Sequence, residues 1–271
     1  MKDIYDYIDK NAQEYIADLQ SLIQQPSVSA QNIGLQECAN FVKNAMHKDN
    51  LPAELYDVPG GPPLVFGHLK SSKSRKTLLC YSHYDVQPPE PIEEWSQGGP
   101  WSGAIVDNVI YGRGATDNKG GLLAFNKAAK AFLEVRGEVP LNLKFFYEGE
   151  EEIGSVHLGP WVEKNKELLK ADGMHCLDGS VDSFAKVPEV ELGLKSVLFI
   201  ELTARGGKKD IHSLNFPLVP SAPWELVHAL STIMDRNRKI LIKDWYQGLY
   251  QLGEEELNLI DEKNSRIDLN V

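Results

Sequence analysis

Three loops of the chain carry polar side chains that could do chemistry, and two of these loops follow apolar runs. His83 and Asp85 come after the run at residues 78–81. Asp117 lies in a turn punctuated by glycines, and the carboxylates Glu150–Glu152 follow a second apolar run. Imidazole and carboxylate groups bind divalent metals and transfer protons. Because open α/β sheets place their ligand sites at strand ends, the sequence predicts one site built from these loops.

Alternating strands and helices are expected to hold these loops. Short apolar runs that stop at polar or Gly/Pro clusters predict strands, and apolar residues three and four apart predict amphipathic helices. Strands are expected at 51–57, 63–69, 78–81, 141–147 and 173–177, and helices at 4–23, 35–46, 118–135 and 158–169. Beyond residue 187 the sequence pattern changes. A long alternating stretch, Val190–Arg205, predicts a strand, and the pattern at Pro223–Met234 predicts a helix.

This order of elements predicts the fold class and the domain organisation. Alternating strands and helices favour an α/β fold, with a mostly parallel sheet sandwiched by helices. Residues 1–187 are expected to form this domain. Residues 188–271 are expected to begin a smaller α+β domain.

Composition and charge narrow the class of protein. The chain has 271 residues, of which 42% are hydrophobic and 25% charged, as in ordinary globular domains. The net charge of −11 argues against a nucleic-acid partner, and no apolar run approaches the roughly 18 residues of a membrane span. The N-terminal pattern is amphipathic and has no signal-peptide core, so a cytoplasmic location is expected. The three cysteines show no metal-binding spacing.

Several of these features have a second interpretation. His83 could be a buried core histidine and Asp178 a turn aspartate. The carboxylate of Asp85, two residues beyond His83, favours the ligand interpretation, because carboxylates commonly orient metal-binding imidazoles. The segment GRGATDNKGG could cradle a phosphate, but it lacks the P-loop ending and the dinucleotide spacing. A nucleotide site is therefore the weaker interpretation.

Five motifs, in order, resemble those of the dinuclear-zinc exopeptidases and deacylases. They are SHYDVQP, GRGATDNKGG, EGEEEIGS, Cys176-Leu177-Asp178 and Asp210-Ile211-His212-Ser213. That family includes carnosinase and related dipeptidases, succinyl-diaminopimelate desuccinylase, acetylornithine deacetylase and aminoacylase. The dipeptidase branch is the most similar, and the resemblance runs from the N-terminus to about Trp224.

The resemblance implies a pair of zinc ions, with Co²⁺ or Mn²⁺ as alternatives, and assigns their ligands. His83 and Asp178 would bind the first ion, Asp117 would bridge the two ions, and Glu152 would bind the second. Glu151 would be the general base. Ions about 3.5–4 Å apart acidify a bridging water, which would attack the amide bond of a dipeptide or an N-acyl amino acid.

Further residues receive implied roles. Asp85 would hold the imidazole of His83 in its tautomer and orientation. His212 would stabilise the oxyanion, and the smaller domain that carries it would act as a lid and as the contact of a homodimer. Glu150 has no role in the family pattern.

The chain departs from the family pattern in its last part. Family members run on beyond Val271 and supply one more histidine to the second zinc, whereas no histidine follows His228 here. The second ion would have only Asp117 and Glu152, fewer than the three protein ligands usual for catalytic zinc. The family also has glycines after the His-Ser pair, where this chain has Leu214–Pro217. The chain therefore resembles a C-terminally truncated form, and whether it is active at this length is open.

A second hypothesis belongs to a different class of protein. A truncated remnant without catalytic activity would act only by binding metal, or by association through its unpaired sheet edges. Metal content and size in solution distinguish this hypothesis from that of a metallohydrolase.

Overall fold

The structure, a computed structural model, describes residues 1–179, 197–207, 212 and 221–264. The chain divides into two units, Met1–Ser180 and Val181–Val271. The boundary expected between residues 187 and 188 lies outside the described residues, so it stays a prediction. Each unit is described by itself.

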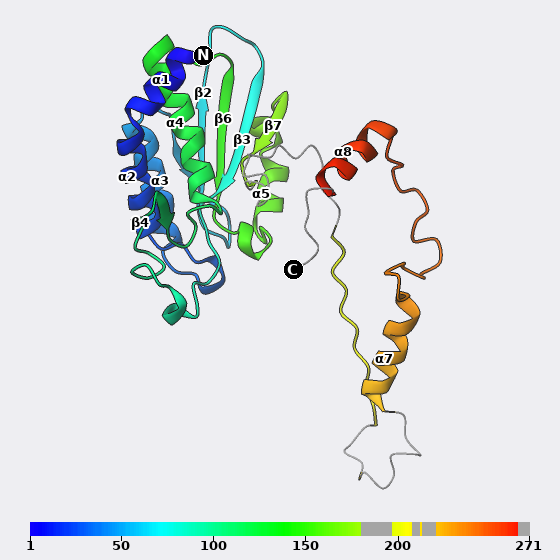
Figure 1. Cartoon of the computed structure of the whole chain (residues 1–271). Helices are drawn as coiled ribbons and strands as arrows, with labels where there is room; N and C mark the ends of the chain where they lie inside the picture. The colour runs from blue at the N-terminus through cyan, green and yellow to red at the C-terminus, as the bar shows by residue number, and fades with distance from the viewer. Residues whose placement is uncertain (180–196, 208–211, 213–220, 265–271) are drawn as a thin grey trace. The chain divides into compact units, whose positions relative to one another are not determined.

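The first unit is built on a five-stranded sheet with the order β1-β2-β6-β3-β7 (Figure 1). Strands β6, β3 and β7 pair in parallel, whereas β2 is antiparallel to both β1 and β6. The sheet is therefore mixed, and the predicted parallel pairing holds for the three strands that carry the candidate site. The short turn between β1 and β2 closes a hairpin, because a parallel crossover needs a dozen or more residues. The strands are β1 (Glu54–Tyr56), β2 (Leu64–Leu69), β3 (Thr77–His83), β6 (Asn142–Glu148) and β7 (Gly173–Cys176).

Alternating side chains of the central strands fill a separate core on each face of the sheet. In β2, Val65 belongs to one core, and its neighbours Leu64 and Phe66 belong to the other. In β6, Tyr147 and Phe146 are divided in the same way. A strand buried on both faces reads as a continuous apolar run, which is why the sequence predicted these strands.

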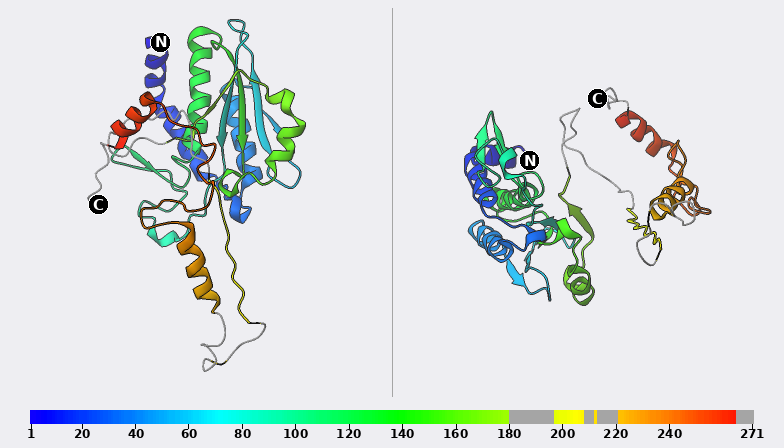
Figure 2. Two further views of the ribbon diagram at one scale, coloured as in Figure 1. Left: turned by 90° about the vertical axis from the view of Figure 1, so that its right-hand side faces the viewer. Right: turned by 90° about the horizontal axis from the view of Figure 1, so that it is seen from below.

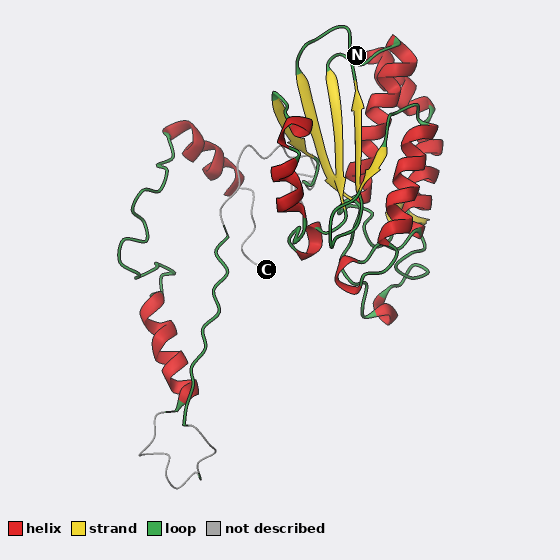
Figure 3. Ribbon diagram, turned by 180° about the vertical axis from the view of Figure 1, so that it is seen from behind, coloured by secondary structure: helices red, strands yellow, loops and turns green. Residues whose placement is uncertain are grey.

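Helices cover both faces, as the predicted α/β fold requires (Figures 2 and 3). The core with Val65 is closed by residues of α2, α3 and α4, and the core with Phe66 by residues of α5 and α6. Two short strands, β4 (Ala104–Val106) and β5 (Val109–Tyr111), form a separate hairpin. The helices are α1 (Lys2–Lys10), α2 (Ala12–Gln24), α3 (Leu35–Lys48), α4 (Lys119–Arg136), α5 (Leu158–Lys164) and α6 (Lys166–Leu169).

Two of the predicted helices are broken in two by an asparagine. Asn11 separates α1 from α2, and its side-chain amide donates to the carbonyl oxygen of Tyr7 at 2.7 Å. Asn165 separates α5 from α6 and donates in the same way to Trp161 at 2.8 Å. Asparagine competes with the helical backbone for hydrogen bonds, so it ends a helix that apolar periodicity alone would continue.

The described part of the second unit contains helices α7 (Ala222–Ile233) and α8 (Glu254–Asn264). Helix α7 agrees with the predicted helix at Pro223–Met234. The strand predicted at Val190–Arg205 is wrong for residues 197–205, which form no strand, and residues 190–196 lie outside the described part. An alternating pattern becomes a strand only where a neighbouring chain accepts its hydrogen bonds, and residues 197–205 have no such ladder.

Among the helices that the structure describes, none is long and apolar enough to cross a membrane.

Candidate metal centre

The candidate site lies where three parallel strands end together. His83 is the last residue of β3, and it pairs in register with Glu148, the last residue of β6. Asp178 follows the end of β7, on the other side of β3. Parallel strands present their carboxyl ends at one edge, and side chains that are far apart in the sequence meet there.

Three of the predicted ligands converge at this edge. The Nε2 atom of His83 lies 3.0 Å from Oδ1 of Asp117 and 3.7 Å from Oδ2 of Asp178. One donor atom from each of the three residues lies within 4.8 Å of the others. The imidazole is fully buried, whereas 63% of the Asp117 side chain is exposed, so the group opens toward solvent on its carboxylate side.

The geometry of this group fits a divalent cation. Nε2 of His83 is buried and has no hydrogen-bond partner among the described residues, although the Asp117 carboxylate is only 3.0 Å away. A buried nitrogen without a partner costs free energy unless another group binds it. One imidazole and two carboxylates form a donor set that zinc accepts. The residues therefore fit the metal that the motifs imply.

Asp85 holds the imidazole from the side opposite the carboxylates. Nδ1 of His83 lies 3.1 Å from the Asp85 backbone oxygen and 3.3 Å from its Oδ1. A proton on Nδ1 satisfies these oxygens and leaves the Nε2 lone pair free for a metal. The Asp85 carboxylate also accepts the backbone N–H groups of Glu151 and Glu152, at 3.2 and 3.1 Å. The fully buried Asp85 thus ties the β3 end to the acidic turn, a link that the sequence did not reveal.

The electrostatics favour a proton on His83 when no cation is bound. Burial lowers the pKa of the His83 imidazole, but the hydrogen bond and charge of Asp85, with the charges of Asp178 and Glu151, outweigh burial and raise it to about 9. Burial raises the pKa of the Asp178, Glu151 and Glu152 carboxyls, and neighbouring carboxylates add to this effect. A group of acids held this close together is stabilised by a cation.

The side chains of the adjacent residues Glu151 and Glu152 occupy different positions relative to the ligand group. Oε2 of Glu151 is 3.9 Å from Nε2 of His83, so Glu151 borders the group of three ligands. The Glu152 carboxylate lies outside that group and accepts a hydrogen bond of 2.8 Å from Nε2 of Gln87. Gln87 also donates to the Glu152 backbone oxygen, at 2.9 Å. The roles of base and second-metal ligand stay predictions. Gln87 lies within the SHYDVQP motif, but its contact with Glu152 could not be predicted from the sequence.

Glu150 has a structural function that the family pattern does not assign to it. Its carboxylate, 7% exposed, accepts the backbone N–H of His157 at 3.1 Å and lies 2.9 Å from the His157 Nδ1 atom. The family pattern assigns no role to Glu150, and His157 belongs to none of the five motifs. Their spacing of seven residues is not a pattern that indicates a side-chain pair.

The glycines of GRGATDNKGG are explained by packing. A Cβ atom on Gly121 would overlap Oδ1 of Asn118 and the carbonyl oxygen of Leu177, which precedes Asp178. Gly114 has φ +83°, and a Cβ atom there would overlap the Val86 side chain. Both glycines therefore allow the Asp117 turn to approach the ends of β3 and β7, and they need no phosphate to explain them.

Comparison with known proteins places this site in a family. Residues 79–251 match peptidase family M20/M25/M40. The chain belongs to this family. This confirms the resemblance that the motifs indicated. Membership in the M20 family implies a divalent metal, and His83, Asp117 and Asp178 form a group whose donor atoms could hold one.

Several relatives align over nearly the whole of this M20 chain. The Cys-Gly metallodipeptidase dug1 of Schizosaccharomyces pombe is 33% identical over 95% of the chain and 57% of its own length. The Beta-Ala-His dipeptidase of Homo sapiens is 29% identical over 95% of the chain and 54% of its own length. The chain thus spans little more than half the length of these relatives.

Solved structures agree with this relationship. An M20 family metallo-carboxypeptidase, Sso-CP2 of Sulfolobus solfataricus, superposes with a TM-score of 0.78 at 37% identity, covering 94% of this chain and 57% of its own. Human carnosine dipeptidase 1 gives a TM-score of 0.69 at 27% identity, covering 100% of this chain and 59% of its own. These structures confirm the predicted α/β fold.

His212, the last predicted site residue of the M20 chain, lies in the second unit. It is exposed, and its neighbours on both sides lie outside the described residues. Its role at the oxyanion stays a prediction.

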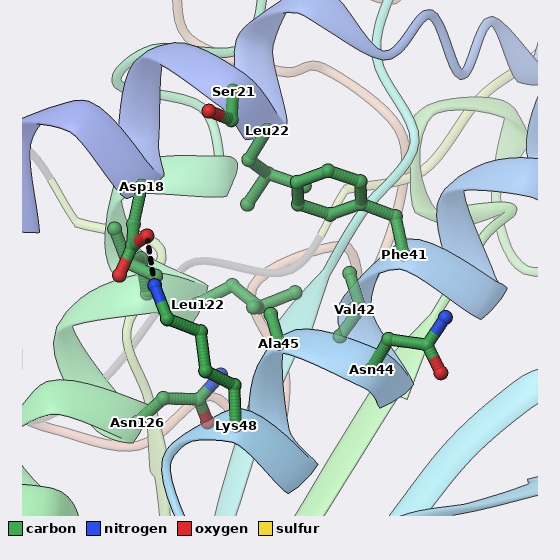
Figure 4. Close-up of a pocket in the computed structure, with 11 residues that line it drawn as sticks. Asp18, Ser21, Leu22, Phe41, Val42, Asn44, Ala45, Lys48, Leu122 and Asn126 are labelled. Atoms are coloured by element: carbon green, nitrogen blue, oxygen red, sulfur yellow. Dashed lines mark hydrogen bonds and ion pairs between the residues drawn. The ribbon is translucent and has the colours of Figure 1, made fainter.

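A separate pocket in the M20 chain contains none of the predicted site residues. It measures about 330 Å³ and lies between α2, α3 and α4 (Figure 4). Leu22, Val42 and Leu122 supply apolar walls, and an ion pair of 3.1 Å between Lys48 and Asp18 lies beside them. The pocket therefore belongs to the helix layer of the fold.

Proposed function

We propose that this chain carries the metal-binding part of a zinc-dependent dipeptidase that hydrolyses the amide bond of dipeptides or N-acyl amino acids. The observation that carries the proposal is the buried Nε2 of His83, which has no hydrogen-bond partner among the described residues and lies beside the carboxylates of Asp117 and Asp178. The names of the most similar relatives, a Cys-Gly metallodipeptidase and a Beta-Ala-His dipeptidase, support the reaction class.

Each ligand receives a role in this proposal. His83, Asp117 and Asp178 would hold one zinc ion, and Asp117 with Glu152 would hold a second. A bound pair of zinc ions would acidify water and polarise the scissile carbonyl. Gln87, hydrogen-bonded to the Glu152 carboxylate, fixes the direction of that side chain.

Glu151 is the proton carrier of the proposed reaction. Its carboxylate is partly exposed and borders the ligand group, with Oε2 3.9 Å from Nε2 of His83. Burial raises its pKa, with the negative charges of Asp178 and Glu152 acting in the same direction. A carboxylate with a raised pKa accepts a proton from the attacking water more readily, and then returns it to the leaving amine.

The remaining features of the proposal concern the whole protein. We place the activity in the cytoplasm and assign homodimer contacts to residues 188–271, with His212 at the oxyanion. No comparison favours the alternative of a non-catalytic remnant.

Metal analysis tests the proposal most directly. The purified chain should hold divalent metal stoichiometrically after dialysis against trace zinc, and Asp117→Ala should lose it. Glu163→Gln, on the exposed surface of α5, is the control that retains metal. A chain without bound metal would rule out the proposed centre.

Substrate assays then test the reaction. The metal-loaded protein should hydrolyse Cys-Gly or β-Ala-His, with an N-acetyl amino acid as the second substrate class. Hydrolysis of the N-acetyl amino acid alone would contradict the dipeptidase assignment and retain the metallohydrolase.

A further inference from the structure

The segment that carries Glu151 and Glu152 has no sheet ladder to hold it. Residues 149–157, here called the glutamate loop, connect β6 to α5 and contain a single 3-10 turn at 151–153. Gly154 and Ser155 have positive φ angles, +85° and +51°. For a serine this is an uncommon conformation, so other contacts must hold the end of the loop.

Glu148 supplies one such contact from the end of β6. Its Oε1 atom accepts hydrogen bonds from the Tyr81 hydroxyl, at 2.6 Å, and from the Ser155 hydroxyl, at 2.8 Å. Glu148 is 3% exposed, and its Oε2 atom has no partner among the described residues. The carboxyl group therefore connects the first and last parts of the loop to strand β3.

The register places this contact beside the proposed ligands. Glu148 pairs with His83 across the β3–β6 ladder, and Tyr81 lies two residues before His83 on the same face of β3. The Ser155 backbone N–H donates to the Glu150 oxygen at 2.8 Å, which closes the loop around the turn that carries Glu151 and Glu152. The Asp85 carboxylate accepts the N–H groups of those two residues from the opposite side.

From these contacts we propose that Glu148 is a positioning residue of the metal centre, which acts through Ser155 and Tyr81 to hold the turn of Glu151 and Glu152 beside the proposed ligands. The proposal rests on the proposed function, because it assigns a purpose to the position of those glutamates. Glu148 is not among the residues whose donor atoms form the candidate ligand group. It fixes where the loop ends, and the Asp85 carboxylate fixes where the 3-10 turn begins.

Hydrogen exchange in the metal-free chain tests the positioning itself. Ser155→Ala and Glu148→Ala should speed amide exchange in the glutamate loop by about tenfold, because the loop opens without its anchor. Glu148→Gln should restore slow exchange, since its oxygen can still accept both hydroxyls. Tyr147→Phe is the matched control: it removes a buried hydrogen bond of 2.9 Å to Asn126 from the same strand, on the opposite face.

Zinc affinity tests whether the anchoring of the glutamate loop by Glu148 serves the metal centre. Zinc titration followed by calorimetry should show a loss of about tenfold in Ser155→Ala, at the low end of the 10–100-fold cost of disturbing partners of metal ligands. Tyr147→Phe should bind zinc as the unsubstituted chain does. Equal affinities in Ser155→Ala and the unsubstituted chain, or an equal loss in Tyr147→Phe, would overturn the proposal.

The two measurements separate the two proposals. An unsubstituted chain that binds no divalent metal refutes the proposed function, and the purpose assigned to Glu148 with it. Unchanged exchange in Ser155→Ala refutes the anchor alone and leaves the metal centre standing.

Discussion

At the scale of single residues, the two nitrogens of His83 have opposite surroundings. Nδ1 faces the oxygens of Asp85, whereas Nε2 faces the carboxylates of Asp117 and Asp178 without a hydrogen bond. This asymmetry fixes the tautomer that a metal ligand needs. The chemistry of the site therefore depends on Asp85 as much as on the ligands.

Replacing Glu151 separates proton transfer from metal binding. Glu151→Gln keeps the size of the side chain and removes the proton acceptor, so metal content should stay unchanged. Turnover, in a form of the protein that hydrolyses dipeptides, should fall by roughly 10²–10⁴-fold. Metal analysis and a dipeptide assay measure the two effects.

Two other glutamates serve as references for this experiment. Glu152→Gln should weaken binding of the second metal, and Glu163→Gln, on the exposed surface of α5, should change neither property. If Glu151→Gln remains fully active, another residue is the base.

The affinity for zinc should depend on pH through His83. Its pKa of about 9 without metal means that zinc displaces a proton at neutral pH. Affinity should therefore rise about tenfold per pH unit below pH 9 and level off above it, because a single proton is displaced. Calorimetric titrations between pH 6 and 8 measure this slope.

Changing Asp85 provides the control for the pH dependence. Asp85→Asn removes the negative charge that helps to raise the pKa of His83, while its amide oxygen can still accept the Nδ1 proton, so the affinity should level off at a lower pH. A pH-independent affinity between 6 and 8 in the unsubstituted chain would contradict the assignment.

At this scale the sequence predicted the residue types and their convergence. His83 stands out because it ends an apolar run, and Asp117 because it lies in a turn punctuated by glycines. Asp178 was assigned through the motifs that resemble those of the family. Gln87 and Glu150 could not be predicted in this way, since their partners are fixed by how the loop folds back. Hydrogen bonds between loops leave no periodic signal.

At the scale of elements, two buried lysines connect the C-terminal ends of helices to neighbouring elements of the first unit. Nζ of Lys119 donates to the carbonyl oxygens of Leu22 and Gln25 at the end of α2, at 3.1 and 2.6 Å. Nζ of Lys144 donates to Leu168 and Lys170 at the end of α6, at 2.5 and 2.7 Å. A cation at a helix C-terminus satisfies the last carbonyl groups and the helix dipole. The two helix layers are thus fixed to the elements that carry the ligands.

The contact of α4 with the end of β7 should be sensitive to a single methyl group. Gly121→Ala would place a Cβ atom against the Leu177 carbonyl and displace Asp178, so zinc affinity should fall by roughly 10–100-fold. Gly159→Ala, in a helix where a Cβ meets open space, is the matched control. Calorimetric titration measures the zinc affinity of both variants. Normal affinity in Gly121→Ala would show that β7 can move without loss of the site.

Apolar periodicity predicted most elements, and its failures have causes that the pattern does not record. Asn11 and Asn165 end helices through their own side chains, a local competition that periodicity does not record. The pairing direction of β1 and β2 depends on the length of their connection. The strand expected at 197–205 needed a partner strand that the pattern alone cannot supply.

At the scale of the whole molecule, metal binding should stabilise the first unit. Its proposed ligands come from four separated segments, so an ion at 100 times its dissociation constant would add about 2.7 kcal/mol to the free energy of unfolding. Calorimetric melting with zinc, and again with chelator, measures the shift for residues 1–179. Asp117→Ala should show no shift, and a shift of the same size in that variant would locate the ion elsewhere.

The pairing of β7 with β3 has a consequence for folding. Four residue pairs, from Leu78 with Gly173 to Tyr81 with Cys176, set the position of Asp178. A slip of one residue would move that carboxylate by about 3.3 Å and turn it to the other face of the sheet. Molecules with slipped strands would then lack a complete set of donors. Zinc added during refolding would bind and stabilise only the correctly aligned molecules. The metal centre would therefore select the correct strand register.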